Sequence, residues 1–440
     1  MKNKTTMIAL MATSILLAGC GGGGGYTGGN TGGGEGGGKF TLQIFAGGYG
    51  TSAWQYALKL FEKDHPEYEI NVNMDNNVNE QFANRWKRGN PPDFVFLDGT
   101  QDRDTWLKEG LLEDLSEWSS TALVPGENVK VGDKINPAYW RTYTDEKGKT
   151  ISYGAPLILN AYGMWYDEAL FEEKGFSMPS NYNELKSFAN TVKADSSGMR
   201  TLIYPGKYSG YLTQGLLVPA FAELGDEIFD RIMNCKDVEV YKTPEFKSII
   251  QRFADFVQTN DRVVADCISA DHTGSQMRWL KHEAALIPNG LWLRGEMEKD
   301  IPEGFRMRYA PSPLVQKQQY IVTTSITCGV AKEASNKKAA KEFMTYLYRD
   351  DVQKQFAYAS DSPVAAKVDF TNDNKVSDVL AYTQSVFNDP AFKHASNNGS
   401  WGGVDKAIND GANTLVDNPS AVDTVINNIV AAATKELSGK

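Results

Sequence analysis

The chain has 440 residues, of which 41% are hydrophobic and 23% charged, and its formal net charge is −10 at pH 7. This length exceeds what a single hydrophobic core usually organises, so two lobes are expected. The acidic composition, with no basic patch interleaved with aromatic residues, excludes nucleic acid as a partner and argues against direct contact of the folded body with anionic lipids.

The N-terminal segment predicts secretion and lipid attachment. Residues 1–19 place Lys2 and Lys4 before a short apolar centre that ends in small residues, which is typical of a signal peptide. Leu17-Ala-Gly-Cys20 resembles a bacterial lipobox, in which diacylglycerol acylates the cysteine thiol and cleavage makes this residue the new N-terminus. The alternative is an ordinary signal peptide with a chance cysteine. Residues 20–38 join this cysteine to a glycine-rich stretch, which predicts a flexible tether of roughly 20–25 Å.

The body begins with strands and helices in alternation. Strands are expected at 40–45, 69–74 and 94–97, one helix from Thr51 to Pro66, and another around Val78, Phe82 and Trp86. Thr51 is expected to cap the first helix. The apolar run 94–97 is typical of a strand covered on both faces, and the alternation implies parallel pairing. The glycine-rich turn 46–50 lacks the lysine of a phosphate loop, which indicates close approach of its backbone to a ligand or a neighbouring strand.

Further strands and helices are expected in the rest of the chain. Extended segments are expected at 154–162 and 164–167, and amphipathic helices around Ala339–Leu347 and Val422–Val430. Asn181 and Glu184 have the spacing of a capping box at a helix start.

Cysteines and acidic residues give no metal-binding pattern. The four cysteines show neither C-x-x-C nor zinc spacing. Cys235 and Cys267 could bridge or could remain free buried thiols. Asp98 begins a segment with the spacing of a calcium loop, but Arg103 occupies the position that requires glycine. No metal and no cofactor are therefore expected.

Aromatic residues near polar turns suggest a binding site. Residues 284–287 are expected to form a buried strand ended by Pro288 and the Asn289-Gly290 turn. Trp292 follows on the loop, where open α/β sheets bind ligands; packing in the core is the alternative. Residues 204–214 carry further tyrosines and amides, which suit the wall of a site for a polar ligand.

Several motifs in this order resemble one family. They are Phe61-Glu-Lys-Asp-His-Pro66, Pro92-Asp-Phe-Val-Phe-Leu-Asp98, Tyr153-Gly-Ala-Pro156 with Trp165-Tyr-Asp-Glu-Ala-Leu-Phe171, Asn289-Gly-Leu-Trp292 and Ala340-Lys-Glu-Phe-Met-Thr-Tyr-Leu347. From about Phe40 to the C-terminus the chain is similar to the extracellular solute-binding proteins of carbohydrate ABC importers, the group that contains maltose-binding protein. It departs from the family at Asn181-Tyr182, where threonine-tryptophan is usual.

The resemblance implies a type II α/β fold with two lobes, several hinge crossings and a ligand cleft between the lobes. The expected lobes are residues 39–157 with 318–367, and residues 158–317 with 368–440. The resemblance implies a binding protein and not an enzyme.

The resemblance also implies roles for individual residues. Trp292 and Trp401 match stacking tryptophans, Asp98 matches an acidic residue that hydrogen-bonds sugar hydroxyls, and either Tyr208 or Tyr211 matches an aromatic wall position. The residues around Tyr208 further resemble the branch that binds N-acetylglucosamine and chitobiose. The candidate ligand-binding residues are Gly48, Tyr49, Asp98, Asn160, Tyr208, Tyr211, Gln214, Asn289, Trp292 and Trp401, and the candidate lipid-attachment residue is Cys20.

The expected function is to capture an oligosaccharide or amino sugar at the cell surface and to deliver it to the transmembrane permease subunits of an ABC importer. The protein is expected to be a monomer, held by its lipid anchor alone to the outer face of the membrane or in the periplasm. One alternative is a secreted glycan-degrading enzyme, but the acidic residues show no recognisable pair for acid–base catalysis. The other is a binder of a non-sugar solute such as a peptide or polyamine.

Overall fold

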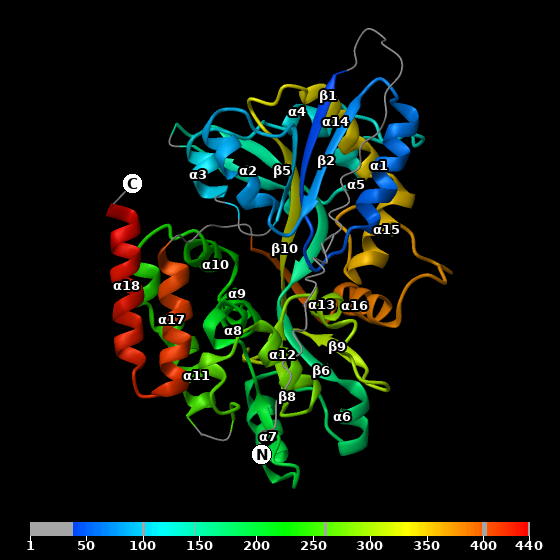
Figure 1. Ribbon diagram of the computed structural model, residues 1–440. Coiled ribbons are helices and arrows are strands. Elements are labelled where there is room, and N and C mark those ends of the chain that lie inside the picture. The colour runs from blue at the N-terminus through cyan, green and yellow to red at the C-terminus, as the bar shows by residue number, and fades with distance from the viewer. Residues whose placement is uncertain are drawn as a thin grey trace, which may run out of the picture.

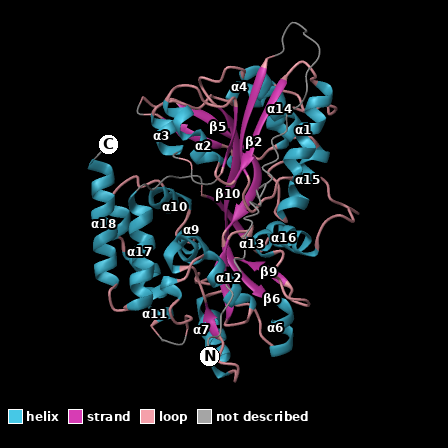
Figure 2. Cartoon of the chain, viewed as in Figure 1, coloured by secondary structure: helices cyan, strands magenta, loops and turns pink. Residues whose placement is uncertain are grey.

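The computed structural model describes residues 38–98, 101, 103–145, 147–258, 262–397 and 403–438. The expectations for Cys20, the tether and Trp401 lie outside these residues. Figure 1 shows two sheets arranged one beyond the other, with helices around each. Figure 2 shows helices on the outside of the strands in both halves.

The first sheet has the strand order β2-β1-β3-β10-β5-β4, and β11 pairs with the start of β10. Its strands are β1 (Lys39–Phe45), β2 (Glu69–Asp75), β3 (Phe94–Leu97), β4 (Arg141–Thr144), β5 (Thr150–Ala161), β10 (Tyr320–Val330) and β11 (Lys393–Ser396). β1 pairs in parallel with β2 and β3, which confirms the predicted parallel arrangement. All four residues of β3 are buried, as its apolar run predicts.

Helices pack on both faces of this sheet. They are α1 (Ser52–Asp64), α2 (Val78–Lys87), α3 (Arg103–Lys108), α4 (Ser116–Thr121), α5 (Val131–Lys134), α14 (Lys337–Leu347) and α15 (Asp350–Ser360). Trp54 of α1 is buried and packs edge-on against Phe94, Phe96 and Phe356, so this tryptophan belongs to the core. Thr51 precedes α1 but makes no side-chain capping bond, because its backbone is not extended as a capping residue requires.

The second sheet has the strand order β7-β8-β6-β9. Its strands are β6 (Gly163–Asp167), β7 (Arg200–Leu202), β8 (Ala284–Asn289) and β9 (Met307–Ala310). The prediction that β8 ends before Pro288 is wrong, since Pro288 and Asn289 pair with β6. β7 pairs with β8 only as far as Leu286, so Pro288 has a neighbouring strand on one side only. A proline, which has no backbone N–H to donate, is tolerated in such a position.

Helices also surround this second sheet. They are α6 (Glu168–Lys174), α7 (Tyr182–Ala194), α8 (Gly210–Leu212), α9 (Val218–Ala222), α10 (Asp226–Met233), α11 (Pro244–Val257), α12 (His272–Leu280), α13 (Leu293–Met297), α16 (Asp378–Asn388), α17 (Gly403–Asp417) and α18 (Val422–Ser438). Asn181 caps α7 as predicted, but the Glu184 carboxylate accepts from the N–H of Ser180 instead of Asn181, so the capping box is displaced by one residue. None of the described helices is long and apolar enough to cross a membrane.

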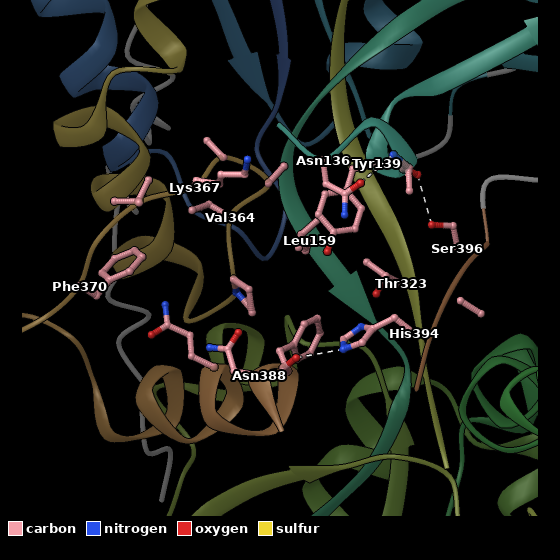
Figure 3. A pocket seen from close by; sticks show the side chains of 18 of the residues that line it. Asn136, Tyr139, Leu159, Thr323, Val364, Lys367, Phe370, Asn388, His394 and Ser396 are labelled. Atoms are coloured by element: carbon pink, nitrogen blue, oxygen red, sulfur yellow. Dashed lines mark hydrogen bonds between the residues drawn. The ribbon is translucent and has the colours of Figure 1, made fainter. Parts of the chain in front are cut away.

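Two strands connect the halves. Leu157 of β5 and Cys328 of β10 lie in the core of the first half, whereas Ala161 and Ile321 of the same strands lie in the core of the second. Figure 3 shows Leu159 and Thr323 on these crossing strands. The lobe boundaries expected from the sequence remain a prediction.

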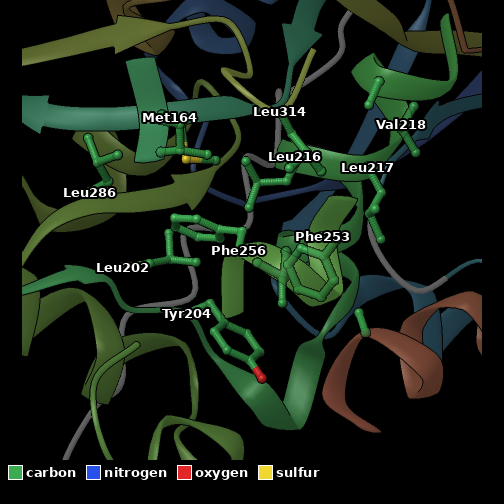
Figure 4. Close-up of a cluster of buried hydrophobic side chains, with 14 of the residues drawn as sticks. Met164, Leu202, Tyr204, Leu216, Leu217, Val218, Phe253, Phe256, Leu286 and Leu314 are labelled. Atoms are coloured by element: carbon green, nitrogen blue, oxygen red, sulfur yellow. The ribbon is translucent and has the colours of Figure 1, made fainter. Parts of the chain in front are cut away.

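The core of the second half is built from apolar side chains of strands and helices that are distant in sequence. Met164 of β6, Leu202 of β7 and Leu286 of β8 meet Phe253 and Phe256 of α11 (Figure 4). This single cluster fixes the second sheet against its helices, and therefore fixes the loop that follows β8.

The cysteines other than Cys20 are buried and form no disulfide, so Cys235 and Cys267 do not bridge. Burial raises the pKa of Cys267 to about 11, which keeps this thiol protonated and unreactive at neutral pH. We expect iodoacetamide to label none of these thiols in the native protein and all three after denaturation without reductant. Labelling of Cys328 alone after denaturation would instead show a Cys235–Cys267 disulfide.

A buried carboxylate joins three segments of the second half. Asp167 caps α6 through Ala169 N (3.0 Å), accepts from Arg306 N (2.8 Å) and meets His282 Nε2 (3.0 Å). The His282 side chain and these N–H groups hold the pKa of the Asp167 carboxyl below its usual range, although burial acts in the opposite direction.

Asp167→Asn is therefore expected to cost about 1–3 kcal/mol of unfolding free energy at neutral pH. The stabilisation by a carboxylate with a lowered folded pKa is complete above the unfolded value near 4, and it is lost as the pH falls through the folded value. Urea unfolding at pH 7 and pH 3 measures this difference. A loss of equal size at both values would contradict an ionic contribution.

Candidate ligand-binding site

Four aromatic rings from separate segments meet between the two sheets. The indole of Trp292 lies edge-on to Tyr162 (ring centroids 5.1 Å apart), Tyr211 (6.1 Å) and Tyr49 (6.2 Å). Trp292 is partly exposed, unlike the core tryptophans Trp54 and Trp165. The rings of Trp292, Tyr162, Tyr211 and Tyr49 are called the aromatic cluster below.

The turn after β8 is built to present Trp292. The Asn160 Oδ1 accepts from Leu291 N at 3.0 Å, and the indole of Trp165 donates to Gly290 O at 3.1 Å. A Cβ atom on Gly290 would lie 2.5 Å from the Trp292 ring, so only glycine fits there. Asn160 and Asn289 are both buried, and their side-chain oxygens accept hydrogen bonds from backbone N–H groups of this turn.

The loop after β1 reaches across to this turn. A Cβ atom on Gly48 would lie 3.2 Å from Trp292 Cβ, and one on Gly295 would lie 2.6 Å from Gly48 O. The close backbone approach predicted for the glycine-rich turn is therefore made to α13. Tyr49 is buried and its hydroxyl has no hydrogen-bond partner among the described residues. Burial, and then the charge of Asp98, raises the pKa of this hydroxyl.

Both tyrosines of the predicted wall lie near the cluster. Tyr211 belongs to it, whereas Tyr208 is 48% exposed and stacks on His272 with ring centroids 3.8 Å apart. His272 also lies 5.0 Å from Tyr211, so the imidazole joins the two tyrosines. Burial lowers the pKa of His272, and its Nδ1 has no partner among the described residues.

Three carboxylates lie near the aromatic cluster. Asp98, Asp405 and Glu296 are all close enough to Tyr162 for their charge to raise the pKa of its hydroxyl, after the larger effect of burial. Glu296 accepts from Gln276 Nε2 at 2.8 Å. Partial desolvation raises the pKa of the carboxyl groups of Glu296 and Asp405.

His272, Glu296 and Asp405 are not among the site residues predicted from the sequence. Each lies on a different helix and none forms a local motif. Gln214, which is a predicted site residue, accepts from Asn397 Nδ2 at 3.2 Å and so connects its helical turn to the segment that leads toward Trp401.

These groups suit one class of ligand. Aromatic faces pack against apolar C–H surfaces, and carboxylates, amides and hydroxyls form hydrogen bonds with a polar rim. A sugar ring combines such a face with such a rim. No cluster of histidine, cysteine and acidic side chains in the described part of the chain could hold a metal ion.

Residues 47–354 match the family described as bacterial extracellular solute-binding protein. The diacetylchitobiose binding protein NgcE of Streptomyces coelicolor is 23% identical over 333 residues, which cover 74% of this chain and 69% of that relative. The solute-binding protein RafE in complex with raffinose superposes with a TM-score of 0.68 at 19% identity, covering 89% of this chain and 98% of that one. A chitin oligosaccharide binding protein gives 0.66 at 17% identity, covering 90% and 98%.

The structural similarities confirm the predicted type II α/β fold with two lobes. The family match covers most of the chain and includes β2 and β3 of the first sheet, both crossing strands and the turn that carries Trp292. The chain belongs to the family of bacterial extracellular solute-binding proteins.

Proposed function

We propose that the protein is the carbohydrate-binding component of an ABC importer and that the aromatic cluster is its sugar site. The observation that carries this proposal is the position of Trp292. It is held by a rigid turn of the second half, touches the loop after β1 of the first half, and has three tyrosines and several carboxylates around it.

A site made from both halves also explains how binding could be signalled. A ligand that contacts Trp292 and the loop at Gly48 stabilises the arrangement in which the lobes are closed. The permease subunits would recognise that arrangement, and no chemical step on the sugar is required. The lobes that close are those expected from the sequence, and the receptor acts as a monomer.

The chemistry of the site favours an oligosaccharide, with N-acetylglucosamine units as first candidates. Two relatives are named for diacetylchitobiose and for chitin oligosaccharides. The stack of Tyr208 on His272 extends the aromatic surface beyond Tyr211 and Trp292, which suits a ligand of more than one ring.

A thermal-shift screen tests the proposal. The body that starts after Cys20 is screened against chitobiose, raffinose, monosaccharides, a dipeptide and spermidine. A ligand at 100 times its Kd adds about 2.7 kcal/mol of stability, which gives a clear shift. Stabilisation by the dipeptide or spermidine alone would reject a sugar receptor, and release of reducing ends from a bound oligosaccharide would indicate an enzyme.

The lipid anchor is a separate part of the proposal and rests on Leu17-Ala-Gly-Cys20. Cys20→Ser removes the thiol that diacylglycerol would acylate. We expect this variant to leave the membrane fraction almost completely, because no other segment is proposed to hold the protein there. Ser14→Ala, in the same leader, is the matched control and should remain bound. Unchanged membrane association of Cys20→Ser would contradict the lipoprotein assignment.

A further inference from the structure

A large open cavity lies away from the aromatic cluster. Its volume is about 1040 Å³ and it is lined by residues of both halves. Leu159 of β5, Thr323 of β10 and the segment 363–371 contribute to its lining, together with Asn136–Tyr139, α10 and α16. Figure 3 shows these walls around the open space. This space is called the hinge cavity below.

The hinge cavity and the aromatic cluster lie on opposite faces of β5. Successive side chains of a strand point to opposite faces. Leu159 lines the cavity, whereas the next residue, Asn160, accepts from Leu291 N beneath Trp292. No residue of the aromatic cluster lines the cavity, so it is a distinct space.

One buried polar group in the wall of the hinge cavity has no hydrogen-bond partner among the described residues. Thr323 is only 3% exposed, and its hydroxyl makes no hydrogen bond to any described residue. Thr323 belongs to the lining of the cavity, and Figure 3 shows it beside the open space. A buried hydroxyl without a partner costs about 1–3 kcal/mol, and a bound ligand that hydrogen-bonds to it would offset that cost.

Apolar rings stand beside polar groups in this wall. Tyr139, Phe370 and Phe387 line the cavity, as do the amide side chains of Gln384 and Asn388. Charged side chains of both signs also line the cavity, namely Lys367 and three aspartates. Asp230 pairs with Lys236, Asp369 accepts from Thr371 N, and Asp226 lies in the first turn of α10, where the helix dipole stabilises a negative charge.

We propose that the hinge cavity is a second ligand site, which takes a neutral hydroxyl-rich molecule with an apolar face, such as a sugar. The aromatic rings would contact the face, and Thr323, Gln384 and Asn388 would bind the rim. The volume is at the upper end of ordinary small-molecule sites, so the cavity accommodates a mono- or disaccharide.

The test separates this site from the aromatic cluster. Trp292→Ala is introduced first, because it weakens the proposed primary site. Saturation-transfer NMR then measures binding of glucose, galactose and N-acetylglucosamine to this protein. We expect signals from at least one of these sugars. Absence of transfer from all three would overturn the proposal, whatever the wild-type protein binds.

Three further substitutions in this background locate the signal. Asn388→Trp places a bulky side chain at the wall of the cavity and should abolish the signal. Ser385→Trp places the same side chain on an exposed position of α16 that does not line the cavity, and should leave it unchanged. Thr323→Val is nearly isosteric and should reduce the signal several-fold without lowering the melting temperature of the free protein. A signal that survives Asn388→Trp, or that Thr323→Val leaves at full strength, would place the sugar elsewhere.

Discussion

Replacing Trp292 by alanine is expected to weaken sugar binding by about 1–3 kcal/mol while the protein remains folded. The indole is partly exposed and lies edge-on to three tyrosines, so its removal takes away a stacking surface. The turn that carries it should survive, because Asn160 and Trp165 hold the backbone of Leu291 and Gly290 and not the indole. Calorimetric titration with the sugar found by thermal shift measures the loss.

Tryptophan fluorescence gives a second readout of the same change. Sugar that stacks on Trp292 alters the environment of the indole, so the ligand-dependent shift should be smaller in Trp292→Ala. Trp292→Phe keeps an aromatic face and should retain part of the affinity. Trp140→Ala removes another partly exposed tryptophan that packs on Trp118 outside the cluster, and it should leave the affinity unchanged.

The opposite outcome is equally specific. If Trp292→Ala unfolds the protein while the affinity per folded molecule stays at the wild-type value, Trp292 is a core residue.

Trp401→Ala is expected to weaken sugar binding by about as much as Trp292→Ala, and this expectation rests on the resemblance of its motif alone.

Local patterns in the sequence predicted several of the regular elements. β3 was predicted with its observed bounds, because its apolar run is flanked directly by Asp93 and Asp98. The glycine-rich turn at Gly48 was predicted to approach a ligand or a neighbouring strand, whereas the structure shows that it approaches Gly295 of α13. Residues 393–396 gave no such signal, because Lys-His-Ala-Ser has no apolar alternation. They form β11 only through pairing with the start of β10.

The site could be predicted only in part, because some of its residues do not belong to a local sequence pattern. Trp292 and Tyr211 stand in motifs with turns and aromatics, and the structure brings them together. His272, Glu296 and Asp405 are single polar residues near helix starts or on short helices. Their proximity depends on how the second core packs α12, α13 and α17 around the sheet, which no local pattern encodes.

Trp165→Ala is expected to behave in the opposite way to Trp292→Ala and to destabilise the protein by about 3–5 kcal/mol. Trp165 is completely buried in β6, the strand between β8 and β9. Its ring packs edge-on against Tyr309 with centroids 5.9 Å apart. Alanine leaves a large cavity there and removes the indole N–H that donates a hydrogen bond to Gly290 O, so both apolar packing and a buried hydrogen bond are lost.

Urea unfolding measures this loss as a lower midpoint with an unchanged slope. Trp165→Phe keeps most of the apolar volume but not the N–H, so it should cost clearly less stability than alanine. Both variants leave Gly290 O without its donor, and this carbonyl belongs to the turn that presents Trp292. Phenylalanine should therefore lower the sugar affinity per folded molecule slightly while largely preserving the fold. A Trp165→Phe protein with reduced stability and full affinity would show that Asn160 alone is sufficient to position the turn.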